Sequence, residues 1–289
     1  MKYLVFPTVL LLVACPPGEP EPVQAEMPPP RSIGTSERPA SVFVPDGYDG
    51  WGSLPVVFGL GGYGDSASDY EARFRLLARV NPMGFILVQP SGTVDQDGAP
   101  FWNATDACCD FYDTGVDDVG YLTGLVDEVL ARFASDPDRV YFFGHGAGGF
   151  MSYRMACEAE SPLAGVMSVS GSTWLRESAC EATHSISVLH AHGLGDEVTP
   201  YVGDFEAPGA DVVVNRWGDR AGCDPRSWSP TLGEREYVDD GEDSETVVAG
   251  YTEGCESGID IELWQLGDNG HFPATNDAFT DDALRFFLE

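Results

Sequence analysis

One stretch, from Arg139 to Cys157, constrains the fold of this chain more than any other. Val140–Phe143 is a short apolar run of β-branched and aromatic residues, which predicts a buried strand. Glycines at positions 144, 146, 148 and 149 predict a sharp turn, and Phe150–Glu158 has helical character. A strand that turns sharply into a helix is a unit of sheets in which strands and helices alternate.

The glycine turn also has the spacing of a catalytic motif. In G-x-S-x-G, a strained turn between a strand and a helix lifts a serine hydroxyl above the sheet. Here the motif is Gly144–Gly148, and Gly146 stands where the serine is expected. A residue with a Cβ adopts such a conformation at a cost of about 1–3 kcal/mol, whereas glycine adopts it freely. The sequence therefore predicts a stable elbow that has lost its nucleophile, and Ser152, six residues further on, is too far along the helix to replace it.

The composition limits the classes of partner. The chain has 289 residues, 43% of them hydrophobic, which is enough for one large α/β domain. Its 15 basic and 47 acidic residues give a formal charge of −32, which repels nucleic-acid phosphates and anionic lipid. We interpret the acidity as a means of solubility or an adaptation to salt. A cationic ligand or calcium is the alternative, but no loop has the EF-hand spacing, and we expect no metal.

The N-terminus is typical of an exported protein. Lys2 precedes an apolar run, Leu4–Val13, that is too short to span a bilayer. Leu12–Cys15 resembles a bacterial lipobox, which predicts a lipoprotein signal peptide over residues 1–15 and acylation of Cys15; an ordinary secretory cleavage site is the alternative. A Pro- and Glu-rich tether is predicted over residues 16–37, followed by one folded domain over residues 38–289. We expect the protein to be lipid-anchored to the cell envelope or secreted.

The cysteine count fits an oxidising compartment. Seven cysteines less Cys15 leave six, an even number that predicts about three disulfides. Adjacent cysteines rarely bond to each other, so each of the pair at 108 and 109 is expected to reach Cys157 or Cys180, which leaves Cys223 with Cys255. A zinc site is the alternative, but the chain has no C-x-x-C pair. The candidate disulfide residues are Cys108, Cys109, Cys157, Cys180, Cys223 and Cys255.

Strands and helices are predicted to alternate, which implies a mostly parallel sheet with helices on both faces. An edge hairpin is expected within the acidic region 204–254. The predicted strands are Ala40–Val44, Leu54–Phe58, Gly84–Pro90, Val140–Phe143, Ala164–Val169, Ile186–Leu189 and Ile259–Leu266; the predicted helices are Ser68–Val80, one ending near Ala134, Phe150–Glu158, Val212–Trp217 and Asn276–Leu288.

A second glycine-rich loop follows the strand at 54–58. Gly59, Gly61 and Gly64 satisfy G-x-G-x-x-G, the pattern of a dinucleotide-binding loop. That reading also needs a carboxylate at the end of the next strand, which instead ends in Val88–Pro90, and there is no Walker lysine. We therefore expect no cofactor. The loop fits better as the oxyanion loop that precedes the first helix of a serine hydrolase.

Two polar residues follow later strands in the order that a catalytic triad requires. In hydrolases with this elbow the chain order is nucleophile, acid, histidine. Asp196 follows the strand that ends near residue 189, and His271 follows the strand that ends near residue 266. Asp196 would orient His271 as a general base toward position 146. The main-chain N–H groups of Tyr63 and Ala147 would form the oxyanion hole.

Several stretches in chain order carry a resemblance to a known family. They are Val44–Asp49, Val116–Gly120, Asp136–Val140, Ser152–Glu158, His192–Asp196 and Gly270-His271. Across the whole folded domain, the chain resembles the secreted α/β-hydrolase esterases related to polyhydroxybutyrate depolymerases and feruloyl esterases. The resemblance implies an α/β-hydrolase fold and, for active members, hydrolysis of carboxylic esters through an acyl-enzyme. The chain departs from the family at Gly146, in place of the serine, and at Gly61-Gly62, in place of the His-Gly that opens the oxyanion loop.

The sequence thus supports more than one function. Our first hypothesis is an inactive esterase homologue that binds an ester, an aromatic acid or a polysaccharide, with Tyr63 and Trp102 as candidate pocket residues. The alternative is a weak hydrolase in which His271 activates a water. A third reading is a structural envelope protein without a ligand. We expect a monomer that meets the membrane only through the lipid on Cys15.

Overall fold

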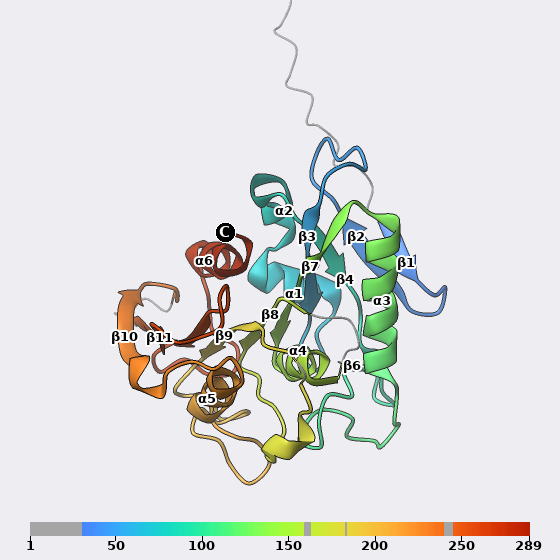
Figure 1. Cartoon of the computed structure of the whole chain (residues 1–289). Helices are drawn as coiled ribbons and strands as arrows, with labels where there is room; N and C mark the ends of the chain where they lie inside the picture. The colour runs from blue at the N-terminus through green and yellow to red at the C-terminus, as the bar shows by residue number, and fades with distance from the viewer. Residues whose placement is uncertain (1–30, 159–162, 183, 240–244) are drawn as a thin grey trace, which may run out of the picture.

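The computed structural model describes residues 31–158, 163–182, 184–239 and 245–289 (Figure 1). The predicted signal peptide, Cys15 and residues 16–30 of the predicted tether lie outside the described residues. None of the helices in the described ranges has the length and apolar character needed to cross a bilayer.

The centre of the molecule is a ten-stranded sheet in the order β1-β2-β4-β3-β7-β8-β9-β12-β11-β10. Its six middle strands, from β4 to β12, are parallel, and antiparallel strands extend both edges. The strands are β1 (Arg31–Gly34), β2 (Pro39–Phe43), β3 (Leu54–Leu60), β4 (Ile86–Gln89), β7 (Ser135–His145), β8 (Gly165–Val169), β9 (Ser187–His192), β10 (Trp228–Arg235), β11 (Thr246–Tyr251) and β12 (Ile261–Gln265). A separate two-stranded sheet joins β5 (Thr93–Val94) to β6 (Pro100–Phe101).

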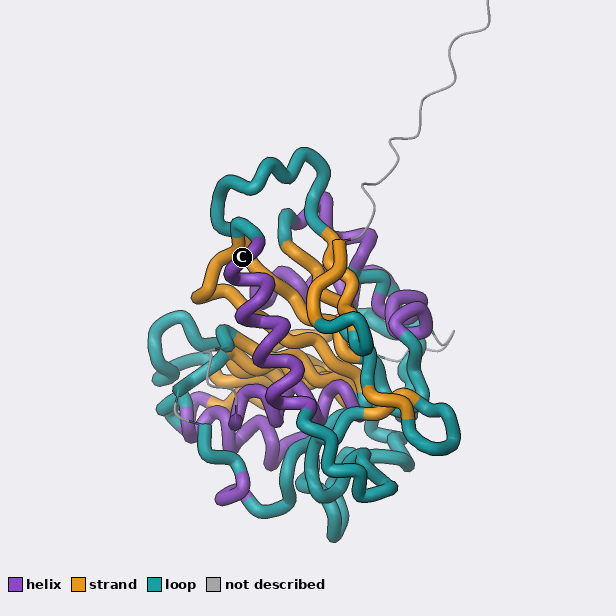
Figure 2. The backbone as a smooth tube through the Cα atoms, turned by 90° about the vertical axis from the view of Figure 1, so that its right-hand side faces the viewer, coloured by secondary structure: helices purple, strands orange, loops and turns teal. Residues whose placement is uncertain are grey.

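Helices cover both faces of the sheet, as Figures 1 and 2 show. One face packs against α3 (Asp118–Arg132), α4 (Ala147–Glu158) and α5 (Ala210–Arg220). The other packs against α1 (Ala67–Phe74), α2 (Leu77–Met83) and α6 (Asp277–Leu288). Alternate residues of a strand serve the two faces: in β3, Val56 and Phe58 belong to the first core and Val57 to the second. The predicted α/β-hydrolase fold, with its mostly parallel sheet, is confirmed.

Two boundaries differ from the sequence-based expectation. The fold begins earlier than residue 38, because β1 pairs with β2 and buries Ile33 in the first core. The helix predicted over 68–80 is two helices. Arg75 ends α1 in the left-handed conformation (φ 51°), where its N–H donates to Glu71 O at 2.7 Å, and α2 starts in a new direction.

The described residues form three disulfides, and the two pairings predicted for Cys108 and Cys109 are wrong. Cys223 bonds to Cys255, as expected, but Cys157 bonds to Cys180, and Cys108 bonds to its neighbour Cys109. The loop that carries the adjacent pair folds back on itself: the Cys109 N–H donates to Trp102 O at 3.1 Å. That turn keeps both sulfurs in the loop, while Cys157 at the end of α4 meets Cys180 with their Cα atoms 5.0 Å apart.

Candidate active site

The bend between β7 and α4 has the geometry of a nucleophile elbow. Gly146 adopts φ +51°, a left-handed conformation that favours glycine. Its N–H donates to Val169 O of β8 at 2.9 Å, and its carbonyl accepts from Phe150 N of α4 at 3.0 Å. Both β8 and α4 therefore hold it in place. A Cβ on Gly148 would lie 2.2 Å from Leu60 O, which explains why this side of the turn is also glycine. The elbow therefore lies tightly against the end of β3.

Asp196 and His271 meet above this bend. The His271 Nδ1 lies 3.0 Å from Asp196 Oδ2, and the other carboxylate oxygen accepts from the N–H groups of Val198 (2.8 Å) and Thr199 (2.9 Å). Since a carboxylate only accepts, His271 Nδ1 carries the proton. Burial raises the pKa of Asp196, but hydrogen bonds from His192, His271 and Thr199 N–H outweigh it and hold this pKa well below its usual range. Asp196 is therefore an ionised acceptor.

The basic nitrogen of His271 faces the residue that lacks a side chain. A Cβ built on Gly146 would lie 2.9 Å from His271 Nε2. The imidazole thus lies beside the bend, and a serine at 146 would fit only after the ring moved by a few tenths of an ångström. No serine is among the pocket-lining residues in the described part of the chain. Ser152 is buried in α4, and its hydroxyl donates to Gly148 O at 2.8 Å.

The expected oxyanion loop follows β3 and is held from three sides. The Gly62 N–H donates to Asp65 Oδ2 (3.1 Å), the Trp102 indole N–H donates to Gly61 O (3.0 Å), and the Gly64 N–H donates to Pro100 O (2.8 Å). These contacts fix the loop even though Gly61 and Gly62 have no side chains. The expectation that Trp102 lines the pocket is wrong: it is 2% exposed, and its indole supports the loop from below.

The N–H groups expected to form the oxyanion hole both belong to pocket-lining residues. They are those of Tyr63 and Ala147. Neither has a hydrogen-bond acceptor among the residues that the structure describes. Ala147 is also the first residue of α4, where main-chain N–H groups are free and the helix dipole favours negative charge. Both groups are thus available to a ligand oxygen.

His145, which the sequence analysis passed over, connects the oxyanion loop to the histidine loop. Its Nε2 lies 2.8 Å from His271 O, and because a carbonyl only accepts, that nitrogen carries the proton. Its Nδ1 then accepts from Arg73 Nη1 at 3.1 Å, and the same Arg73 nitrogen donates to Asp65 at 2.9 Å. Burial lowers the pKa of His145, so the ring is neutral in this arrangement. The only signal in the sequence was its place beside Gly146 in the glycine motif.

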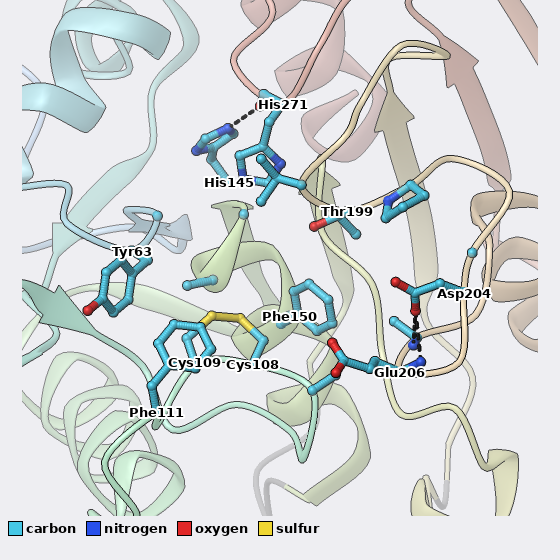
Figure 3. Close-up of a pocket in the computed structure, with 18 of the residues that line it drawn as sticks. Tyr63, Cys108, Cys109, Phe111, His145, Phe150, Thr199, Asp204, Glu206 and His271 are labelled. Carbon is cyan, nitrogen blue, oxygen red and sulfur yellow. Dashed lines mark hydrogen bonds between the residues drawn. A yellow bond between two sulfur atoms is a disulfide. The ribbon is translucent and has the colours of Figure 1, made fainter.

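A pocket with a volume of about 330 Å³ opens above Gly146 (Figure 3). Its walls are mostly apolar and include the Cys108–Cys109 disulfide, Tyr63, Phe111 and Phe150. Tyr63 is 38% exposed, and its hydroxyl donates to Asp95 at 2.6 Å. The polar lining includes the carboxylates of Asp204 and Glu206, and no lysine or arginine lines the pocket within the described ranges.

Comparison with known proteins agrees with this geometry. The family model described as Phospholipase/Carboxylesterase matches residues 56–207, more than half of the chain. The chain belongs to this carboxylesterase family. The matched region contains the oxyanion loop, the elbow and Asp196.

Individual relatives of this domain are named as esterases. The chain is 23% identical over 247 residues to feruloyl esterase B from Piromyces equi, covering 81% of this chain and 42% of that protein. It spans about half the length of the curated relatives it matches. Among solved structures, the acetyl xylan esterase from Aspergillus awamori aligns with a TM-score of 0.62 at 12% identity, covering 89% of this chain and 98% of the other. Esterase PE8 aligns with a TM-score of 0.54 at 18% identity, covering 85% and 97%. Both structural matches show the fold.

The buried histidines make the stability of the domain depend on pH. Burial lowers the pKa of His145 and His190 below the ordinary value of 6.5, so these rings bind protons in the unfolded chain before they do in the folded one. Stability therefore falls as pH falls below 6.5, by up to about 1.4 kcal/mol per pH unit for each histidine. The low pKa of Asp196 adds its own loss only in more acidic solution, below about pH 4.

We expect the free energy of unfolding, measured by urea titration, to fall by about 1–3 kcal/mol between pH 7 and pH 5.5. In His190→Gln the slope should be smaller, because one titrating ring is gone. A stability that is flat or rises over this interval would contradict the assignment of neutral buried rings.

Proposed function

We propose that this domain is a carboxylesterase homologue that binds an ester without hydrolysing it. One observation carries the proposal: Gly146 occupies the nucleophile position, while the Asp196–His271 pair and the two candidate oxyanion N–H groups lie around it. Binding requires the pocket and the donors, whereas turnover through an acyl-enzyme requires a hydroxyl at residue 146. In serine hydrolases the loss of the nucleophile lowers the rate by about 10⁶.

The pocket lining suggests the kind of ligand. An aromatic or aliphatic ester fits the apolar wall formed by Phe111, Phe150 and the Cys108–Cys109 disulfide, with its carbonyl oxygen near the Ala147 N–H. Asp204 and Glu206 disfavour a free carboxylate, so an uncharged ester suits the site better than the acid released from it. Relatives named as feruloyl and acetyl xylan esterases support an aromatic or acetyl ester carried on a polysaccharide.

A second candidate is a weak hydrolase in which His271 activates a water. The observation that favours it is the Nε2 of His271, which faces the pocket on a ring that Asp196 orients. The close approach of this nitrogen to residue 146 speaks for binding over turnover, because it leaves less room for a water between ring and bend. Any slow wild-type hydrolysis that His271→Ala abolishes would support this second candidate.

Restoring the hydroxyl tests the main proposal. We expect wild-type protein to show negligible hydrolysis of 4-nitrophenyl acetate. Gly146→Ser should raise kcat/KM at least about 100-fold, since loss of the nucleophile lowers the rate of serine hydrolases by about 10⁶. Gly146→Ala is the matched control: it adds the same Cβ without a nucleophile and should gain no activity. Both variants should lose about 1–3 kcal/mol of stability, because a Cβ is strained at φ +51° and meets His271. A wild-type rate typical of serine esterases, or equal gains in both variants, would contradict the proposal.

We further propose that the chain is exported and anchored by a lipid on Cys15. The lipobox-like sequence Leu12–Cys15 supports the anchor, and the disulfides favour an oxidising compartment. Expressed in a bacterium with a lipoprotein pathway, the full chain should incorporate radiolabelled palmitate and sediment with membranes. Cys15→Ser should lose both properties, and label that persists in that variant would exclude Cys15 as the acylated residue.

A further inference from the structure

A chain of buried polar rings leads from the elbow helix to the candidate acid. The Tyr153 hydroxyl on α4 lies 2.8 Å from His190 Nδ1 on β9. His190 Nε2 lies 3.0 Å from His192 Nδ1, and His192 Nε2 lies 2.7 Å from Thr199 O. The three side chains are at most 1% exposed, and none of them lines the ligand pocket. Their polar atoms are therefore satisfied by one another and by Thr199 O.

Both ends of this hydrogen-bonded row of side chains, Tyr153 and His192, impose the same direction on its hydrogen bonds. Burial raises the pKa of Tyr153, so the hydroxyl keeps its proton, and its one acceptor among the described residues is His190 Nδ1. At the other end Thr199 O can only accept, so His192 Nε2 must donate. Between them, His190 Nε2 donates to His192 Nδ1. Both rings are then neutral and carry their proton on Nε2.

The last donor of this row, His192 Nε2, also lies close to the candidate acid. His192 Nε2 lies 3.3 Å from Asp196 Oδ2, the oxygen that accepts from His271 Nδ1. Its hydrogen bond goes to Thr199 O, and the carboxylate oxygen is a second, longer contact of the same nitrogen. The same loop, through Val198 and Thr199, forms part of the pocket wall. His192 therefore contacts both the acid and the wall from beneath.

We propose that His192 is the positioning residue for Asp196, that Thr199 O holds its ring in the donating tautomer, and that His190 is the partner of its other nitrogen. This inference rests on the proposed role of Asp196 and His271 as a retained acid–base pair. Packing alone does not require two histidines here, because their strand neighbours in the sheet interior, Leu189 and Ala191, are apolar and equally buried. A polar chain in such a place is stabilising only when each member has its partner. Here the last member of the row, His192, contacts the candidate acid Asp196.

Histidine NMR tests the proposal without any need for turnover. In ¹⁵N-labelled wild-type protein at pH 7, long-range ¹H–¹⁵N spectra should show His190 and His192 as neutral Nε2–H tautomers and His271 with its proton on Nδ1. A proton on Nδ1 of His192, or a doubly protonated His192 ring, would overturn the proposal.

Two matched variants isolate the donor. The amide of glutamine can reach the place of the histidine Nε2, whereas that of asparagine reaches only the place of Nδ1. We expect His192→Gln to keep a sharp His271 Nδ1–H signal and His192→Asn to lose or broaden it, because Asp196 is no longer held. Tyr153→Phe is the packing control and should keep the signal, since Thr199 O still fixes the tautomer of His192. An unchanged signal in a folded His192→Asn variant, or an equal loss in Tyr153→Phe, would overturn the proposal.

These results are independent of the esterase assay. If the NMR pattern holds while Gly146→Ser stays inactive, the positioning role stands and the proposed cause of inactivity fails. If Gly146→Ser becomes active while His192→Asn leaves the His271 signal intact, the proposed cause of inactivity stands and the positioning role of His192 fails.

Discussion

The left-handed backbone at residue 146 is the constraint on which the rest of the site depends. A parallel strand that ends under a helix N-terminus can expose one residue at the top of the turn only if that residue accepts φ near +51°. The glycines on either side allow α4 to approach the end of β3, and the fold places the loops after β9 and β12 above the same point. The position would exist with serine or glycine. Glycine makes it less strained, and under our proposal it also removes the hydroxyl on which turnover depends.

What remains around Gly146 is an organised polar site. Asp196 accepts hydrogen bonds from His271 and two main-chain N–H groups, lies 3.3 Å from His192 Nε2, and is 5% exposed. Such a group is costly to bury unless its partners stay in place, so the surrounding histidines stabilise the fold as well as the site. The neutral His145 joins the loop at Asp65 to the loop at His271 in the same way. This double role explains how the architecture can persist once the hydroxyl is absent.

Much of this could be predicted from the sequence, because the central strands are apolar runs and the glycine turn at 144–149 has the spacing of a nucleophile elbow. The order of Gly146, Asp196 and His271 along the chain anticipated that the three meet. The pairing of Cys108, Cys109, Cys157 and Cys180 could not be predicted, since it depends on how the loop after Trp102 folds back. β1 was missed because Ile33 is its only buried residue. The strand predicted over Ile186–Leu189 stopped short of His190 and His192, because two polar residues at alternate positions gave no sign that β9 buries both.

The central claim is that the chain has no activated hydroxyl at the end of β7. The most direct measurement is the intact mass of wild-type protein after incubation with a fluorophosphonate, which phosphonylates the activated serine of serine hydrolases. Our account predicts an unmodified mass under conditions that label a serine esterase to completion. A stoichiometric adduct on one hydroxyl of the wild-type pocket would contradict it.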